Sequence, residues 1–315
     1  MEPARSQHEQ ELQRLTAGED EVVAAIAQRR KLAGLPMWLW GVIVLFVLVG
    51  LFFIPGGAKQ ELEIAAEFDL EPLVELPTIG PFDLSITKAV VYLWIATAVI
   101  VVVAIVIARN IKPQPSRFQY AMEALYELAY DGITASVMKS GVSTWFPYVG
   151  AAFFFILVNN LVGLIPLPFG EHHQLSFYAA TANLNVTITL ALFTFLFTHY
   201  AGMKKNGPVT YIRNWMPKGA PPVLREFIFV IHIVSEVFRL ISLSVRLFAN
   251  MVAGHAILAV FFAMALIFQS YLAAVVLQGG SVLIYMFEIF VAVIQAFIFA
   301  ILSAVYLGGA LDQEH

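Results

Sequence analysis

Six long apolar stretches run through the chain, and polar or Pro/Gly-rich segments separate them. The stretches are Met37–Ile54, Thr87–Ala108, Trp145–Ile165, Leu184–Gly202, Phe227–Phe268 and Ser281–Leu307. A helix needs about 20 apolar residues to cross a hydrocarbon core of roughly 30 Å. The pattern therefore predicts an all-α membrane protein with about six membrane-crossing helices.

The fifth stretch is too long for one upright crossing. Its 42 residues would form a helix of about 63 Å at ~1.5 Å per residue. Either this helix is steeply tilted, or it breaks into two pieces near Gly254 or Gln269. We expect a long inclined helix followed by a second one at Ser281–Leu307. Two long, steeply tilted C-terminal helices would then present a broad face to a neighbour in the membrane.

The segment Ser116–Ser140 predicts an amphipathic helix rather than a crossing. Apolar side chains share one helical face and acidic side chains form a stripe at a spacing of four; they are Phe118, Met122, Leu125 and Ala129, and Glu123, Glu127 and Asp131. Ser116 and Gln119 fit a capping box at its start. A helix on the cytoplasmic membrane surface and a solvated face packed on the rest of the protein both account for this pattern.

Positive charges orient the chain in the membrane. They precede the first stretch and follow the second and the fourth, as Arg29, Arg30 and Lys31, then Arg109, Lys112 and Arg117, then Lys204, Lys205, Arg213, Lys218 and Arg225. The segment Pro55–Ser85 is acidic instead. Because cytoplasmic loops carry an excess of Lys and Arg, we predict a multi-pass bacterial inner-membrane protein with both termini in the cytoplasm.

Composition excludes several classes of protein. Of the 315 residues, 60% are hydrophobic and only 13% are charged, which excludes an ordinary soluble domain. The chain has no cysteine, so disulfides and thiolate metal sites are excluded. Nothing in the sequence indicates nucleic-acid binding or a bound cofactor.

The stretches divide the chain into four parts. We predict a cytoplasmic tail at residues 1–36, an extra membrane helix at 37–54, a periplasmic segment at 55–86 and a membrane domain at 87–315. The helix at 37–54 has an alternative interpretation as a cleavable signal peptide, with Arg29–Lys31 as the charged region and Gly56 and Ala58 before the cut. A preceding region of 36 residues is long for a signal peptide, and 18 apolar residues just suffice to span.

Polar groups that are energetically unfavourable inside a membrane are concentrated in the two C-terminal stretches. They are His232, Ser235, Glu236, Arg239, Ser242, Arg246, Asn250, His255, Glu288 and Gln295. A charged group at the bilayer centre costs about 2.5–3.5 kcal/mol on the most lenient scale, so each such residue is a candidate for function. Glu236 and Arg239 are three residues apart, where a local ion pair and a conducting role are both open.

Arg246 is the hardest of these groups to explain as structural. It lies about twenty residues from either end of its apolar stretch, and Glu236 is about 15 Å away along the helix axis. A salt bridge to Glu288 on the next helix is one interpretation. The other is a carboxylate on a different subunit, present only part of the time.

His255 and Glu288 both titrate, as proton relays require. Gln295 follows Glu288 by seven residues and so lies on nearly the same helical face, with Tyr306 close to that line. A polar stripe for proton transfer and a hydrogen-bonded packing seam between helices both fit Gln295 and Tyr306.

Two segments resemble the subunit a family of F-type ATP synthases. Ser242-Leu-Ser-Val-Arg246-Leu-Phe-Ala-Asn250-Met-Val-Ala-Gly254-His255 resembles the arginine segment of that family, and Glu288-Ile-Phe-Val-Ala-Val-Ile-Gln295 resembles its final helix. Asn183-Leu-Asn185-Val-Thr187 resembles a third, weaker segment. The resemblance runs from about Thr87 to the C-terminus.

The resemblance implies a role for each matching residue. Arg246 would be the stator arginine that meets the carboxylate of each passing c subunit, and Asn250, His255, Glu288 and Gln295 would line a periplasmic half-channel. The partners would be the c-ring, the peripheral-stalk b subunits, membrane lipid and, indirectly, the soluble head that carries the ATP chemistry. The chain itself would not be catalytic.

The resemblance leaves two parts of the implied proton path without assigned residues. Many bacterial relatives have an aspartate where this chain has Asn183, and Glu171, His172 or His173 in the same loop are candidate substitutes. On the cytoplasmic side, only His232, Ser235 and Glu236 are candidates.

Other functions fit the sequence less well. A proton-coupled secondary transporter also places charges in the membrane, but it usually shows internal repeats and Gly/Pro-broken helices, and the sequence has neither. It has no H-E-x-x-H or G-x-S-x-G motif and no Lys after Lys218 for a Schiff base. The His172–His173 pair has no further ligands in its loop, which is typical of solvated histidines rather than a metal site.

Overall fold

The computed structural model describes residues 72–76, 85–165, 178–217, 219, 221–267 and 271–312. Several predicted features lie outside these residues. They are the tail at 1–36, the helix at 37–54, most of the segment at 55–86, and Glu171, His172 and His173.

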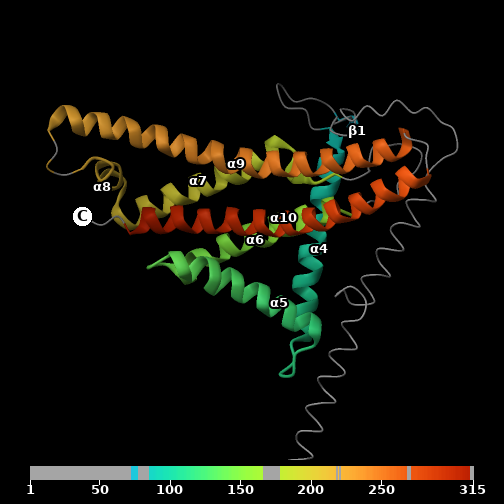
Figure 1. Cartoon of the computed structure of the whole chain (residues 1–315). Coiled ribbons are helices and arrows are strands. Elements are labelled where there is room, and N and C mark those ends of the chain that lie inside the picture. Colours follow the sequence, from blue (N-terminus) through green and yellow to red (C-terminus); the bar gives the residue numbers. More distant parts are fainter. Residues whose placement is uncertain are drawn as a thin grey trace, which may run out of the picture. The chain divides into compact units, whose positions relative to one another are not determined.

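The described chain is helical apart from one short strand pair (Figure 1). The elements are β1 (Pro72–Val74), β2 (Ile86–Thr87), α4 (Lys88–Asn110), α5 (Arg117–Glu127), the π-helix η1 (Leu128–Ala135), α6 (Val142–Gly163), the 3-10 helix η3 (Ala180–Ala182), α7 (Leu184–Asn206), α8 (Pro208–Arg213), α9 (Pro222–Ile267) and α10 (Tyr271–Leu311). β1 and β2 pair antiparallel.

Five of the described helices, α4, α6, α7, α9 and α10, are long and apolar enough to cross a membrane. They correspond to the last five of the six predicted crossings. The predicted fold class, an all-α membrane protein, is confirmed.

The last two helices are longer than the predicted stretches of 42 and 27 residues, Phe227–Phe268 and Ser281–Leu307. α9 has 46 residues and α10 has 41, so α9 extends about 69 Å at ~1.5 Å per residue. α9 does not break at Gly254, and Gln269 lies outside the described residues. Figure 1 shows α9 and α10 side by side, crossing α4 at a steep angle. Residues Met264–Val282 belong to a separate compact unit, and the packing described below is that of Glu61–Ala263 and Leu283–His315.

α9 and α10 pack antiparallel. The carboxyl group of Glu288 lies against Gly254, and the guanidinium of Arg239 lies 5.1 Å from the ring centroid of Tyr306. Moving forward along α9 therefore means moving backward along α10. By this register, Arg246 lies between the two points of contact.

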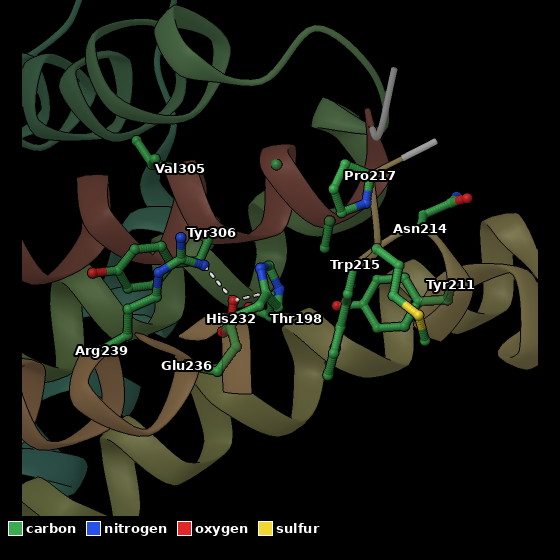
Figure 2. Close-up of a pocket in the computed structure, with 13 residues that line it drawn as sticks. Thr198, Tyr211, Asn214, Trp215, Pro217, His232, Glu236, Arg239, Val305 and Tyr306 are labelled. Carbon is green, nitrogen blue, oxygen red and sulfur yellow. Dashed lines mark hydrogen bonds and ion pairs between the residues drawn. The ribbon is translucent and has the colours of Figure 1, made fainter. Parts of the chain in front are cut away.

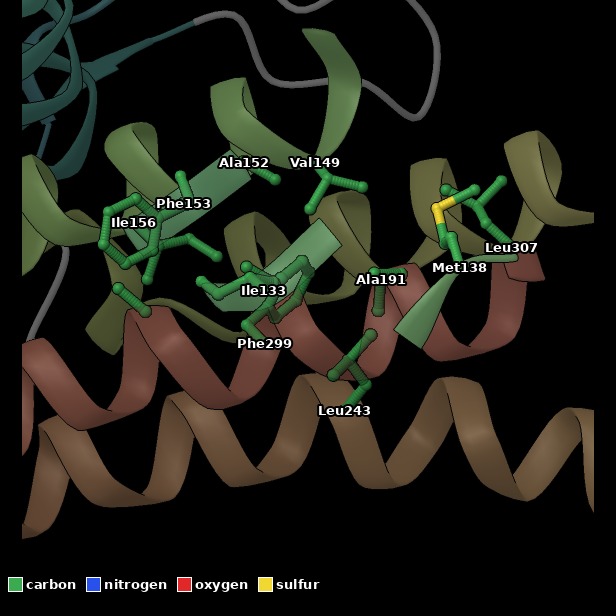
Figure 3. Close-up of a cluster of buried hydrophobic side chains, with 14 of the residues drawn as sticks. Ile133, Met138, Val149, Ala152, Phe153, Ile156, Ala191, Leu243, Phe299 and Leu307 are labelled. Carbon is green, nitrogen blue, oxygen red and sulfur yellow. The ribbon is translucent and has the colours of Figure 1, made fainter. Parts of the chain in front are cut away.

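Small residues allow this close approach. Ala292, Ala296, Ala300 and Ala304 repeat every four residues on α10, and all four are buried. Small residues at this spacing let membrane helices pack backbone to backbone. Side chains from η1, α6, α7 and α9 fill the space around this stripe (Figure 3), and Phe153 is among the largest that are fully buried.

The segment Ser116–Ser140 is an amphipathic helix that changes from α5 to the π-helix η1. The Ser116 hydroxyl caps α5 by accepting from the backbone N–H of Gln119 at 3.2 Å, as predicted. Ala129 and Ile133 are buried in the core against α6. The predicted acidic stripe is exposed. The segment therefore packs on the protein through its apolar side.

Polar contacts hold the C-terminal end of α10. Asp312 accepts from the Ser140 hydroxyl at 2.6 Å and from Lys205 at 3.0 Å, and Lys205 also donates to Ser140 at 2.8 Å. The hydrogen bond from Ser140, followed by the Lys205 ammonium, holds the pKa of Asp312 below its ordinary value of 3.8. We call these three residues the C-terminal clamp.

Candidate functional site

The polar residues of α9 and α10 form two clusters. One surrounds His255 and Glu288, and the other surrounds Glu236. Arg246 lies between them on α9, nine residues from His255 and ten from Glu236. These separations correspond to about 13 and 15 Å along the helix axis.

The first cluster is buried between the two long helices. His255 is 5% exposed and Glu288 is 6% exposed. The Glu288 carboxyl group rests against Gly254, where any Cβ would overlap it. Within the described residues, Nδ1 of His255 has no hydrogen-bond partner. Two titratable groups on adjoining helices are thus buried within about one residue of the same level, and among the described residues neither forms a salt bridge.

Two amides extend this cluster. Gln295 is buried two turns after Glu288 on α10, and Asn250 is partly buried on α9. The antiparallel register brings these two residues to about the same level, between Glu288 and Arg246. The polar stripe predicted on α10 is therefore present inside the helix pair.

The segment before α7 approaches the same region. Ala179 and Ala182 pack with Met251 of α9. Beside them, Thr181 donates to the side chain of Asn160 at 2.6 Å, and Asn160 donates to the carbonyl of Ala292 at 3.3 Å. These buried hydrogen bonds could not be predicted from the sequence, because the residues that form them lie on three separate elements.

Asn183 and Asn185, the weaker candidates of this segment, have a local role. The Asn183 side chain caps α7 by accepting from the backbone N–H of Asn185 at 2.8 Å, and Asn185 is exposed. Helix capping accounts for the Asn183 side chain.

The second cluster lines a cavity of about 500 Å³ (Figure 2). Glu236 is 8% exposed. It accepts from Arg239 at 2.6 Å, and His232 Nε2 lies 3.4 Å from the same carboxylate oxygen. Of the two interpretations left open for Glu236 and Arg239, the local ion pair is present in the structure. The cavity is lined by Thr198, Tyr211, Asn214, Trp215, Met216, Pro217, His232, Glu236, Arg239, Val305, Tyr306, Gly309 and Ala310.

Several of these lining residues were missed in the sequence. Tyr211 and Trp215 come from α8 and the turn that follows it, where nothing in the local pattern distinguishes them from ordinary loop aromatics. In the structure, the Trp215 ring lies 4.7 Å from the ring of His232. Burial raises the pKa of Tyr211 to about 12, with a smaller contribution from Glu236, so its hydroxyl stays neutral.

Arg246 belongs to neither cluster. Its side chain is exposed on α9, and within the described residues no carboxylate lies within salt-bridge distance of it. The salt bridge to Glu288 that the sequence left open is not formed. Ser235 and Ser242 are also exposed and lie outside the cavity lining.

Arg246 lies on an apolar exposed face. The exposed large side chains of α9 recur at helical spacing as Phe227, Val230, Ile231, Val234, Phe238, Ile241, Val245 and Ile257. An arginine on such a face either pairs with an anionic group of another molecule or contacts lipid, which is energetically unfavourable. In the described residues, no group of three or more His, Cys, Asp or Glu side chains is placed to hold a metal ion.

Fold and site together define a class of protein. It is a multi-pass membrane protein whose two longest helices carry titratable side chains in their apolar sequence, on both sides of an arginine with no carboxylate partner among the described residues. Intramembrane ionisable groups of this kind mark ion pathways.

Comparison with known proteins identifies the family. The profile of the ATP synthase A chain family matches residues 90–308. The ATP synthase subunit a of Rubrobacter xylanophilus is 38% identical over 238 residues, which cover 75% of this chain and 88% of that protein. The ATP synthase subunit a 2 of Prosthecochloris aestuarii is 39% identical over 249 residues, 76% of this chain and 74% of that protein. The chain belongs to the ATP synthase A chain family.

Proposed function

We propose that this chain is the proton-translocating subunit a of a bacterial F-type ATP synthase, with Arg246 as its stator arginine. The observation that carries the proposal is the position of Arg246, exposed on the apolar face of α9 and midway between two titratable clusters. The chain would make and break no covalent bond, and the ATP chemistry would belong to the soluble head.

The partner at this face would be the c-ring. A ring subunit that carries one membrane carboxylate would supply the anion that Arg246 lacks among the described residues, and the apolar side chains around Arg246 suit a helix surface in lipid. The peripheral-stalk b subunits would hold the chain still while the ring turns.

The two clusters would be two half-channels. His255, Glu288, Asn250 and Gln295 would form the periplasmic one, and the cavity at His232 and Glu236 the cytoplasmic one. The orientation follows from Lys204, Lys205 and Arg213, which lie at the cavity end of the structure on α7 and α8, because positive residues favour the cytoplasmic side.

Arg246 would separate these half-channels electrostatically. A guanidinium has a pKa above ~12, so it does not pass a proton on, and it favours an ionised carboxylate opposite it. It also repels a hydronium ion that moves directly between the clusters. A proton must therefore travel on the ring, and each crossing releases about 2.3 kcal/mol per 100 mV of membrane potential.

The test is ATP-driven acidification of inverted membrane vesicles. Arg246→Ala should abolish pumping while the ring and the ATPase still co-purify with the chain. The matched control is Arg109→Ala, which removes an arginine from the last turn of α4 and should leave pumping intact. Unchanged pumping in Arg246→Ala would overturn the proposal. If no ATPase co-purifies even with the wild-type chain, the chain would be a proton-coupled transporter instead.

A further inference from the structure

The cavity at Glu236 has a wall of aromatic rings that the proposed function does not use. Trp215 is at its centre, with ring centroids at 4.7 Å from His232, 5.5 Å from Tyr211, 5.7 Å from His199 and 6.1 Å from Phe229. These rings come from α7, α8 and α9. A residue of the connection after α8 thus covers a titratable side chain of α9.

Trp215 is held in place from behind by Tyr211. The Tyr211 ring is 4% exposed and lies against Gly202, where any Cβ would overlap it. Its hydroxyl lies 2.8 Å from Nδ1 of His199. The backbone N–H of Trp215 then donates to the carbonyl of Ile212 at 3.2 Å. Ring packing against Tyr211 and its own backbone hydrogen bond to Ile212 therefore hold Trp215 in place.

The titratable groups around His232 come from α9 itself and from the elements packed against it. On α9, the Glu236 carboxylate lies 3.4 Å from Nε2 of His232 and accepts from the Arg239 guanidinium at 2.6 Å. His199 of α7 lies behind Trp215. Tyr211 of α8 is neutral, and Tyr306 of α10 faces Arg239 instead.

The indole adds an interaction that these charges do not supply. A cation next to the face of a tryptophan ring is attracted by the ring quadrupole. The planes of Trp215 and His232 are inclined by 37°, so the imidazole faces the indole surface rather than its edge. The contact is thus stronger when His232 carries a proton.

We propose that Trp215 is a positioning residue for proton transfer: it holds His232 beside Glu236 and stabilises the protonated imidazole at the cavity. The inference rests on the proposed function, because it assigns His232 to the path between the cavity and the ring. Tyr211 and His199 support it by fixing the indole.

The experiment measures ATP-driven pumping by inverted vesicles while the external pH is varied and the internal pH is buffered. The external medium faces the cavity in this preparation. Trp215→Leu keeps an apolar cover over His232 but removes the aromatic face. The half-maximal pH on the alkaline side should therefore fall by roughly 0.5 unit. Trp215→Phe should keep the wild-type profile, because a phenyl face remains.

Four further variants make the result specific. Trp94→Leu, on the exposed surface of α4, should leave the profile unchanged. In a His232→Gln background, Trp215→Leu should cause no additional shift. Tyr211→Phe removes the bond to His199 and should give a smaller shift in the same direction, while Tyr200→Phe on the exposed side of α7 should give none.

Two outcomes would overturn the inference. One is an equal profile for Trp215→Leu and Trp215→Phe at equal amounts of assembled complex. The other is a Trp215→Leu shift that persists in the His232→Gln background. Neither depends on the loss of pumping in Arg246→Ala, so failure of this inference and failure of the proposed function are distinguishable.

Discussion

At the scale of single residues, Gly254 decides where the Glu288 carboxyl group lies. Gly is about 1 kcal/mol worse than Ala inside a helix, yet position 254 is in the interior of α9. The Glu288 carboxyl occupies the space that a methyl group would need. The glycine therefore makes room for the Glu288 carboxyl group but lowers the stability of the helix.

Gly254→Ala should slow proton transport to about the rate of Glu288→Gln, even though it improves helix propensity. The methyl group would displace the carboxyl from its place against residue 254. Pumping in inverted vesicles measures the effect, and the double variant should be no slower than Glu288→Gln alone. Gly279→Ala is the control, since a Cβ at that position meets no atom within 4 Å. Wild-type turnover of Glu288→Gln across a range of pH would remove Glu288 from the relay.

At the scale of elements, the C-terminal clamp joins the start of α6, the last turn of α7 and the end of α10. Ser140, Lys205 and Asp312 meet there through hydrogen bonds of 2.6 to 3.0 Å. A force that a moving partner exerts on α9 and α10 would be transmitted to α6 and α7 through these three residues. The clamp is at the same end of α10 as the cavity, since Ala310 lines the cavity and accepts from Asn206.

Asp312→Asn should lower the thermal stability of the purified complex by less than about 1 kcal/mol, because Lys205 is partly solvated. The pKa of Asp312 is held below 3.8 in the folded chain. The stabilisation is therefore fully present above the ordinary pKa and is lost only as the pH falls through the lowered pKa. Thermal melts of wild type and variant should differ at pH 7 and converge in strong acid. A difference that vanished between pH 6 and 8 would contradict the assignment.

At the scale of the whole molecule, the length of the apolar stretches was enough to predict the five long described helices. The 42 apolar residues of the fifth stretch exceed what a core of roughly 30 Å requires, so a very long helix was expected there. The spacing of Glu236 and Arg239 made a local ion pair one of two open interpretations. Such features are local, so sequence patterns report them.

The sequence did not indicate features that depend on contacts between distant segments. Nothing near Trp215 reveals that it lies on His232, because α7 and α8 fold back over the start of α9. The contact of Gly254 with Glu288 depends on the register of two antiparallel helices. The choice between a Glu288 partner and an external partner for Arg246 was open for the same reason.

Arg246 has no carboxylate partner in the part of the chain that the structure describes, which also bears on the fate of the chain before assembly. Without a partner, α9 exposes a permanent positive charge to lipid, at a cost of about 2.5–3.5 kcal/mol for a residue at the bilayer centre. Docking against a carboxylate removes this penalty. An unassembled subunit would therefore be less stable in the membrane, and we expect membrane proteases to degrade it faster. Pulse-chase labelling in cells that lack the ring should show a longer half-life for Arg246→Leu than for wild type. Equal half-lives would mean that the charge of Arg246 does not affect degradation of the unassembled chain.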